Sequence, residues 1–266
     1  MSVYPSAAHY YSSFLEGFER SAKHTANEKN LTKTSCNGLL SDKAKKRLEK
    51  NINWLVFLAK KKEIVQQSTG KRFWFKVNFI TLTLPAKQTH TDAEITKVCL
   101  GNFLNVCRKM TGLTKYVWRA EAQKNGNIHY HITTDTYIPY QMVNLWWNQS
   151  VELLNYVTVF QQKFHHRNPP STQIRSVVKI KNLAAYLCKY MSKQKDGYRL
   201  IESKQWFCSR ELSAMSSLKC SSEMPNYDMV DDLIKDCTDR VFQSDYVTSC
   251  YGDMTDVCNS LLAMDN

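Results

Sequence analysis

Residues 116–134 have the sequence YVWRAEAQKNGNIHYHITT, and this stretch decides the fold. Segments 116–122 and 128–134 are rich in aromatic and β-branched residues, which favour strands. Asn125-Gly126 between them is typical of a tight turn, so the two segments are predicted to form an antiparallel hairpin. Because side chains alternate along a strand, His129 and His131 are expected on one face, where two imidazoles can bind one metal ion.

The position of Glu121 depends on the length of the turn. With a two-residue turn, Glu121 would pair opposite Tyr130 and face away from the histidines. With a three-residue loop closed by Gly126 in the left-handed conformation, Glu121 pairs opposite His129 on the same face. The metal-site hypothesis therefore predicts the three-residue loop. The alternative is an ordinary exposed carboxylate on a strand, and an H-x-H sequence alone is weak evidence in a chain with seven histidines.

The segments around the hairpin alternate between strand and helix patterns. An aromatic and β-branched run over 73–84 stops at Pro85 and predicts a strand. The other predicted elements are helices over 92–110, 140–154 and 183–193 and a strand over 174–180. Local hairpins with intervening helices predict an α+β domain with a central, mostly antiparallel β-sheet and flanking helices.

Three parts of the chain are expected from these patterns. Residues 1–70 contain a Lys-rich helical stretch at 41–50 and are expected to be a basic helical N-terminal extension. Residues 71–200 carry the sheet and its helices. Residues 201–266 are weakly patterned and are expected to be an acidic C-terminal extension. The Lys-rich helix face could touch DNA phosphates, but a merely solvated face is the favoured interpretation.

The segment at 183–193 has the sequence LAAYLCKYMSK. On a helix, Tyr186, Lys189, Tyr190 and Lys193 follow the spacing i, i+3, i+4 and i+7 and so share one face. A phenol is a weak nucleophile while protonated, and nearby positive charge favours the phenolate that could attack a phosphodiester. The alternative is an amphipathic helix whose Tyr and Lys side chains simply face solvent.

Charge points to a polyanionic partner. The chain of 266 residues has a net charge of +12, although residues 201–266 hold twelve acidic and only five basic residues. The first 200 residues are therefore strongly basic, and nucleic acid is the leading partner, with a solvated basic surface as the alternative.

Composition excludes several other classes. No apolar run approaches the roughly 20 residues that cross a bilayer, and no secretory leader is evident, so an intracellular protein without a membrane partner is expected. The nine cysteines form no C-x-x-C pair, so a zinc ribbon is not indicated.

Four aromatic residues after the histidine strand could stack on unpaired bases. They are Tyr137, Tyr140, Trp146 and Trp147. For the two tryptophans, packing in the core is the favoured interpretation.

Together these segments resemble the HUH endonuclease superfamily, and specifically the rolling-circle replication initiators of single-stranded DNA phages and viruses. The resemblance covers about residues 71–212. Its three motifs are Phe79-Ile-Thr-Leu-Thr-Leu-Pro85, His129-Tyr-His131 and Tyr186-Leu-Cys-Lys189-Tyr190-Met-Ser-Lys193, and two tyrosines four residues apart are most similar to the microvirus type. The segments Asn168-Pro-Pro-Ser-Thr172 and Trp206-Phe-Cys-Ser209 also look like parts of phage replication proteins.

The resemblance implies a metal-dependent nicking enzyme, with an HUH endonuclease domain at 71–200. Glu121, His129 and His131 would bind Mg²⁺ or Mn²⁺. One tyrosine would attack the scissile phosphate and stay joined to the 5′ end. Tyr186 is the expected first nucleophile and Tyr190 the second, and Lys189 and Lys193 would position phosphate.

The resemblance also implies partners and a location. The expected partners are single-stranded DNA at a replication origin and the host's DNA polymerase and helicase. No G-x-x-x-x-G-K-[ST] sequence occurs, so no helicase domain of this chain's own is expected. The expected location is the cytoplasm of the host cell, or the nucleus of a eukaryotic host.

Other functions remain open at this point. A relaxase or transposase of a plasmid or mobile element would share the chemistry and differ in substrate. His131-Ile-Thr133 also matches the H-x-T motif of two-histidine phosphoesterases, but the second such motif that they need does not occur. A histidine-triad hydrolase would need a histidine at position 133. A non-catalytic DNA-binding module on the same fold is the last alternative.

Overall fold

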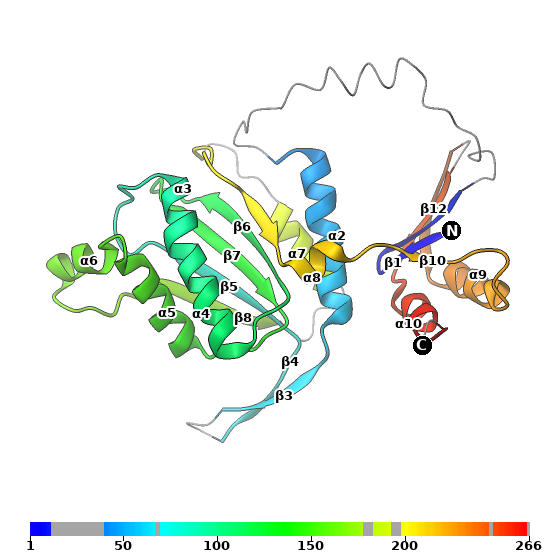
Figure 1. Ribbon diagram of the computed structural model, residues 1–266, viewed down its shortest axis with the longest axis horizontal. Helices are drawn as coiled ribbons and strands as arrows, with labels where there is room; N and C mark the ends of the chain where they lie inside the picture. The colour runs from blue at the N-terminus through cyan, green and yellow to red at the C-terminus, as the bar shows by residue number, and fades with distance from the viewer. Residues whose placement is uncertain (12–39, 67–69, 178–182, 193–197, 245–246, 265–266) are drawn as a thin grey trace, which may run out of the picture. The chain divides into compact units, whose positions relative to one another are not determined.

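The computed structural model describes residues 1–11, 40–66, 70–177, 183–192, 198–244 and 247–264. The chain forms two compact units, one from Met1–Ser35 with Met215–Asn266 and one from Cys36–Ala214 (Figure 1). These boundaries do not coincide with those expected at residues 70 and 200. Among the described residues, no helix is both long enough and apolar enough to cross a membrane.

The first unit joins the two ends of the chain in one antiparallel sheet of order β10-β1-β2-β12-β11. Its strands are β1 (Ser2–Tyr4), β2 (Ala7–Tyr11), β10 (Leu218–Lys219), β11 (Thr238–Gln243) and β12 (Val247–Gly252). Helices α9 (Tyr227–Asp236) and α10 (Thr255–Met264) complete the unit, and α10 packs against β1 and β10. Residues 1–11 are thus strands paired with the C-terminal segment, a long-range pairing that local sequence patterns do not show.

The second unit is built on a five-stranded sheet of order β8-β5-β7-β6-β9, in which every neighbouring pair is antiparallel. Its strands are β5 (Val77–Thr83), β6 (Tyr116–Ala122), β7 (Ile128–Thr134), β8 (Thr172–Val177) and β9 (Trp206–Cys208). The α+β class with antiparallel sheets is confirmed. The edge strand β9 lies beyond residue 200, so this sheet extends past the boundary expected from the sequence.

The β6–β7 hairpin has the three-residue loop. The Gly126 N–H donates to the Gln123 carbonyl at 2.9 Å, and the Gln123 N–H donates to the Asn127 carbonyl at 2.8 Å. Gly126 has φ +82°, the left-handed conformation that favours glycine. This loop sets Glu121 directly opposite His129. The register predicted by the metal-site hypothesis is confirmed.

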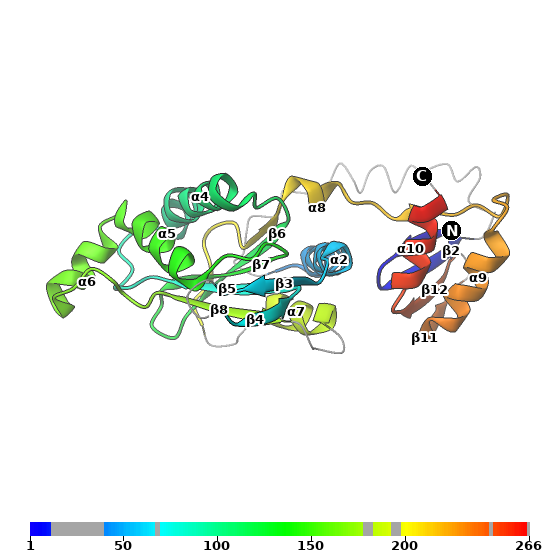
Figure 2. The ribbon, with the colours of Figure 1, turned by 90° about the horizontal axis from the view of Figure 1, so that it is seen from below.

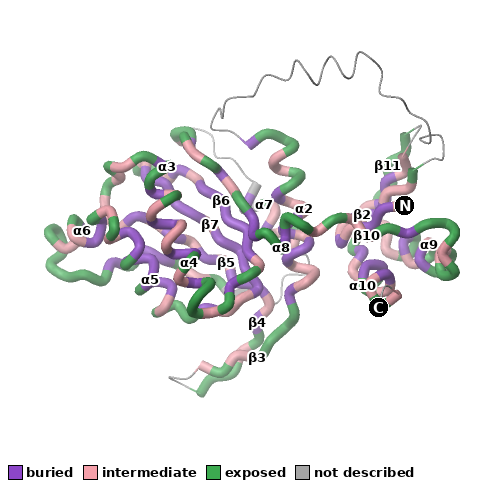
Figure 3. The backbone as a smooth tube through the Cα atoms, in the orientation of Figure 1, coloured by how far each residue is buried: buried purple, intermediate pink, exposed green. Residues whose placement is uncertain are grey.

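Helices cover one face of this sheet. They are α3 (Asp92–Glu94), the π-helix η2 (Ile95–Leu100), α4 (Gly101–Thr111), α5 (Tyr140–Glu152) and α6 (Tyr156–Phe164). Thr91 and Glu94 form a reciprocal capping box that starts the first of them. Tyr130 and Ile132 of β7 pack in the core with Phe103 and Trp147 (Figure 3). Trp146 and Trp147 are both buried, so core packing is confirmed for them.

Two further helices of this unit pack against each other. Helix α2 (Asp42–Leu58) begins at the N-cap Ser41 and packs against α7 (Leu183–Ser192) and the short α8 (Arg210–Ala214). Figures 1 and 2 show α7 on the side of the sheet away from α4 and α5. The sheet therefore has one face covered by the α4 and α5 layer and an opposite face on the side of α7.

The predicted strand over 73–84 is wrong in one respect, because it is two strands that serve two sheets. β4 (Arg72–Phe75) pairs with β3 (Lys62–Val65), whereas β5 begins at Val77 and pairs with β7 and β8. The break at Lys76 is set by this change of partners, which the continuous apolar pattern does not reveal.

A buried ion pair fixes the hairpin loop to the rest of the unit. Arg199 donates to both carboxylate oxygens of Asp92 at 2.7 Å and, through Nε, to the Gly126 carbonyl at 2.5 Å. Burial raises the pKa of Asp92, but hydrogen bonds from Arg199, Gln88 and the Glu202 backbone outweigh it and leave that pKa below its usual value. The carboxylate is therefore ionised in the folded protein at all but strongly acidic pH.

We expect Asp92→Asn to remove this contribution. A lowered pKa in the folded state means stability that is present above about pH 4 and is lost as pH falls further. The variant should lose about 2 kcal/mol at pH 7, less than for a fully buried pair because Arg199 is partly exposed. Its stability should also fall less steeply below pH 4. Urea unfolding at pH 3 to 7 measures both effects, and parallel pH curves for the two proteins would contradict the assignment.

Gly126→Ala tests the loop conformation. A Cβ would meet no atom within 4 Å, so the cost comes from the left-handed backbone, about 1 kcal/mol. Gly101→Ala is the matched control, since Gly101 is helical and a Cβ there makes only an ordinary 3.8 Å contact. Urea unfolding should show a loss for Gly126→Ala and no loss for Gly101→Ala. Equal effects would argue against the three-residue loop.

Candidate metal centre

Three ligand side chains converge on the β6–β7 hairpin. Glu121 Oε2 lies 3.5 Å from His129 Nε2 and 3.7 Å from His131 Nε2. The three ligand atoms all lie within 4.8 Å of one another, so one ion between them could contact each. The convergence follows from the register, which sets Glu121 across from His129, and from strand alternation, which keeps His131 on the same face.

The site is largely shielded from solvent. The side chains of Glu121, His129 and His131 are 10%, 9% and 16% exposed, so Glu121 is not the exposed strand carboxylate of the alternative interpretation. Burial by itself raises the pKa of Glu121. Hydrogen bonds from His129 and His131 and the positive charges of His131 and Arg119 outweigh burial and hold that pKa far below its usual value. The carboxylate is therefore an anionic ligand throughout the physiological range.

His131 is held from both sides. Its Nδ1 lies 3.1 Å from Thr81 Oγ1, which sits directly across the β5–β7 pairing. The Phe79 ring stacks on the imidazole at 5.1 Å with an interplanar angle of 19°. Because Nδ1 is engaged by Thr81, Nε2 is the nitrogen turned toward Glu121 and the ion site. Sequence analysis missed the roles of Thr81 and Phe79, although both lie in the first motif.

Arg119 is a further residue of the site that sequence analysis missed. Its Nε lies 3.6 Å from Glu121 Oε1, the oxygen not turned toward the histidines, and its side chain is only 5% exposed. Neither Nε nor Nη1 forms a hydrogen bond to any described residue. Burial lowers the pKa of Arg119, but an arginine stays charged in proteins. The signal was present in the sequence, since Arg119 stands two positions before Glu121 and so shares its face.

The donor set fits a divalent cation. Two imidazole nitrogens and one carboxylate oxygen leave open positions on an octahedral ion for phosphate and water. Carboxylate and water oxygens suit both Mg²⁺ and Mn²⁺, and the imidazoles shift the preference toward the transition metal.

The predicted nucleophile helix is only partly described. Tyr186 is half-buried and Lys189 is exposed on α7, whereas Leu187 and Met191 are buried and form the expected apolar stripe. Nothing is described of the Tyr190 side chain, and Lys193 lies outside the described residues. The ligand residues alternate along their strands with Ala120 and Tyr130, which face the α4 and α5 layer. The ligands therefore face the side of the sheet on which α7 lies.

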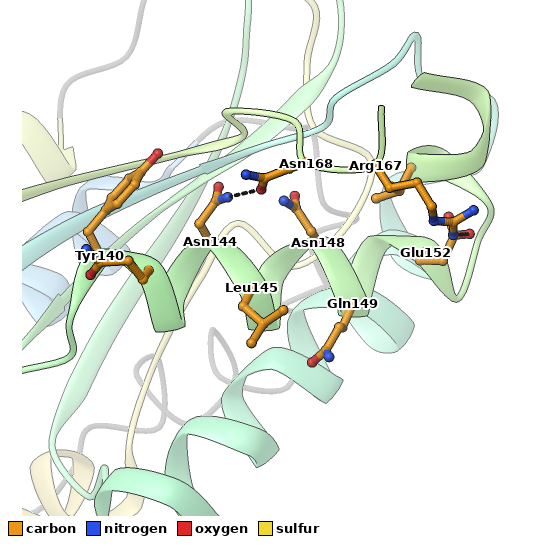
Figure 4. A pocket seen from close by; sticks show the side chains of 10 residues that line it. Tyr140, Asn144, Leu145, Asn148, Gln149, Glu152, Arg167 and Asn168 are labelled. Atoms are coloured by element: carbon orange, nitrogen blue, oxygen red, sulfur yellow. Dashed lines mark hydrogen bonds and ion pairs between the residues drawn. The ribbon is translucent and has the colours of Figure 1, made fainter. Parts of the chain in front are cut away.

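A separate cavity of about 290 Å³ lies beside α5 (Figure 4). Its amides tie α5 to the segment before β8, since Asn144 donates to Asn168 at 3.0 Å and Asn148 donates to the Pro169 carbonyl at 3.1 Å. Tyr140 stands at its edge and is 45% exposed. The cavity contains none of the predicted site residues, so it is distinct from the metal centre.

These features define an α+β protein with a candidate centre of two histidines and one glutamate on an antiparallel sheet. Residues 77–195 match the model of the replication-associated protein family of ORF2 and the gene 2 protein, and over this stretch the chain belongs to that family. The matched stretch contains the whole hairpin and helix α7. No curated protein matches the chain. The resemblance to phage replication proteins is thereby confirmed.

Metal binding should depend on the three ligands and on Arg119. We expect Glu121→Gln to weaken Mn²⁺ binding at least tenfold, because it removes the anionic ligand. Arg119→Gln should weaken it about tenfold, a typical effect of losing a group that orients a ligand. Titration with Mn²⁺ followed by electron paramagnetic resonance measures both. Arg119→Lys, which keeps the charge, should recover part of the affinity.

His166→Ala is the matched control, since His166 is exposed and lies outside the hairpin. It should bind Mn²⁺ like the unmodified protein, whereas His131→Ala should not. Unchanged Mn²⁺ affinity in both Glu121→Gln and His131→Ala, with folding intact, would disprove the metal centre.

Proposed function

We propose that this protein nicks and rejoins single-stranded origin DNA through a tyrosine and so initiates rolling-circle replication. The observation that carries the proposal is the convergence of Glu121, His129 and His131, inside the stretch matched by the replication-associated family. A bound divalent ion would polarise the scissile phosphate and offset charge in the transition state. The buried, anionic Glu121 beside Arg119 supports a built site of this kind.

In the proposed reaction, the Tyr186 hydroxyl loses its proton and its oxygen attacks the phosphorus. The bond from phosphorus to the 3′ oxygen breaks, and that oxygen takes up a proton to become a 3′-hydroxyl. The 5′ phosphate stays on the tyrosine as a phosphodiester, so the step is reversible and needs no outside energy source. Tyr190 would cut the regenerated origin while Tyr186 holds the first end, and Lys189 and Lys193 would position phosphate.

The rest of the proposal concerns partners and place. The freed 3′-hydroxyl is the primer that a DNA polymerase of the host would extend, with strand separation by a host helicase. The reaction would take place in the cytoplasm of the host cell, or in the nucleus if the host is eukaryotic.

Two alternatives are weighed by specific observations. A relaxase or transposase would use the same chemistry, and the family match to replication-associated proteins favours replication. A two-histidine phosphoesterase would present the threonine of H-x-T to its substrate. Thr133 is fully buried, which argues against that reaction.

The tyrosines should be required for a covalent intermediate. With Mn²⁺ and an origin-bearing oligonucleotide, the unmodified protein should form an adduct that survives denaturing electrophoresis. Tyr186→Phe combined with Tyr190→Phe should abolish it, because the phenolic oxygens are the attacking atoms. Sequencing the attached DNA end identifies the nick site and distinguishes a replication origin from a plasmid or transposon end.

Tyr140→Phe is the control, since Tyr140 is an exposed tyrosine outside α7. It should form the adduct at the normal rate. An adduct that persists in the double variant would remove Tyr186 and Tyr190 as nucleophiles. His131→Ala should suppress cleavage more than DNA binding, and equal loss of both would point to a folding role instead.

A further inference from the structure

Strands β3 and β4 form a two-stranded ribbon, separate from both larger sheets, which together with its flanking residues 60–61 and 76 we call the basic arm. Figure 1 shows the ribbon extending away from the five-stranded sheet of its own unit. A lone two-stranded hairpin is only marginally stable in water. The basic arm therefore needs an anchor, and its exposed surface needs a role.

One face of the basic arm provides the anchor. The Tyr137 ring meets the edges of Phe73 and Phe75 at centroid distances of 5.7 and 5.6 Å. Phe75 is fully buried, and Lys62 Nζ donates to the Asp135 carbonyl at 3.3 Å. Tyr137, which sequence analysis considered for base stacking, thus packs at the base of the basic arm.

The opposite face is exposed. The register pairs Glu63 with Trp74 and Val65 with Arg72, and alternation sets these four side chains on one face. Trp74 and Val65 are each 51% exposed. The Lys61 ammonium lies 4.4 Å from the centre of the Trp74 ring, a cation–π contact at the surface. An indole and a valine displayed beside cations are unusual for a face that only meets water.

Charge on the basic arm is one-sided. Residues 60–76 contain six basic residues and one acidic residue. The acidic residue, Glu63, contacts Arg72 at 3.5 Å, where both side chains are well exposed and the pair is weak. Lys60, Lys61 and Lys62 are all exposed. The basic arm therefore presents a strong excess of positive charge, which matches a polyanion.

We propose that the basic arm binds duplex DNA, with the ribbon in the major groove and its lysines and Arg72 on the flanking phosphates. The major groove of B-form DNA is wide enough to admit a two-stranded β-ribbon. Lysine and arginine on phosphates set the affinity, and apolar side chains such as Trp74 and Val65 can contact base edges and thymine methyl groups. This inference rests on the proposed function for the identity of the polyanion as DNA.

The distance to the metal centre suits one continuous DNA molecule. β5 leads from the basic arm to Thr81, which faces His131, and to Thr83, which pairs with His129. At about 3.3 Å per residue, Phe75 lies about 20 Å from Thr81 along the chain. One turn of duplex spans about 34 Å. Duplex DNA next to a single strand held at the metal centre would therefore reach the basic arm within one helical turn.

The test compares duplex binding with nicking. Fluorescence anisotropy with a labelled 20-base-pair duplex, repeated over a range of salt concentrations, measures affinity and its salt dependence. Lys61→Ala combined with Trp74→Ala should weaken duplex binding about tenfold and make the salt dependence shallower by about one unit of slope. Adduct formation with a single-stranded oligonucleotide should stay unchanged, which also shows that the variant folds.

The matched control is Lys163→Ala combined with Phe164→Ala on α6. There the lysine Nζ lies 5.3 Å from the centre of a 49% exposed aromatic ring, so the same kind of pair is removed. This control should bind duplex like the unmodified protein. Equal affinity losses in the two double variants, or no loss in the Lys61 and Trp74 variant, would overturn the proposal.

Two other results separate the ligands and the hypotheses. A loss confined to a single-stranded 20-mer would also overturn the proposal, because the basic arm would then be a single-strand site. If the unmodified protein formed no adduct while the basic arm variant still lost duplex affinity, the proposed nicking function would fail and the basic arm would stand as a DNA-binding element.

Discussion

Side chains on a strand alternate with a period of two, and this constraint on the β6–β7 hairpin controls the whole centre. A slip of one residue would turn Glu121 to the face that packs against α4 and α5. There it would replace Ala120 among apolar neighbours, where an unpaired carboxylate costs several kcal/mol. The same slip would draw Tyr130 out of the core. Core packing and the ligand geometry therefore enforce one register, and Gly126 supplies the loop that this register needs.

The two faces of the sheet have different work. One is apolar and holds the helices, and its burial supplies the stability. The other carries charged and imidazole side chains that are also shielded from water, an arrangement that is tolerable only because the charges offset one another. Glu121 stands between Arg119 on one oxygen and the histidines on the other. The polar cluster is thus preorganised around a position suited to a cation, and shielding strengthens each interaction within it.

The chain is organised less simply than its charge pattern indicates. Basic and acidic halves suggest a domain with two extensions, but residues 1–11 pair with strands from the last 50 residues in a separate unit. The sheet that carries the metal centre also takes its edge strand β9 from beyond residue 200. Net charge describes which polyanion the surface attracts. It says nothing about which strands pair, because pairing depends on matching apolar faces.

Local sequence determined the parts of this protein that depend on near neighbours. The hairpin, the shared face of His129 and His131, the helix at 183–192 and the burial of Trp147 follow from alternation, turn chemistry and helical spacing. Even Glu121 could be predicted conditionally, because only one loop length satisfies the ligand geometry.

Only the tertiary structure decided what depends on distant partners. The break at Lys76, the joining of the two chain ends and the positions of Thr81 and Arg119 around the ligands involve residues far apart in the chain or a choice between sheets. A strand pattern states which side chains share a face, but not which strand lies beside it. The energy that selects the neighbour is the burial of the whole core, and no single segment contains that information.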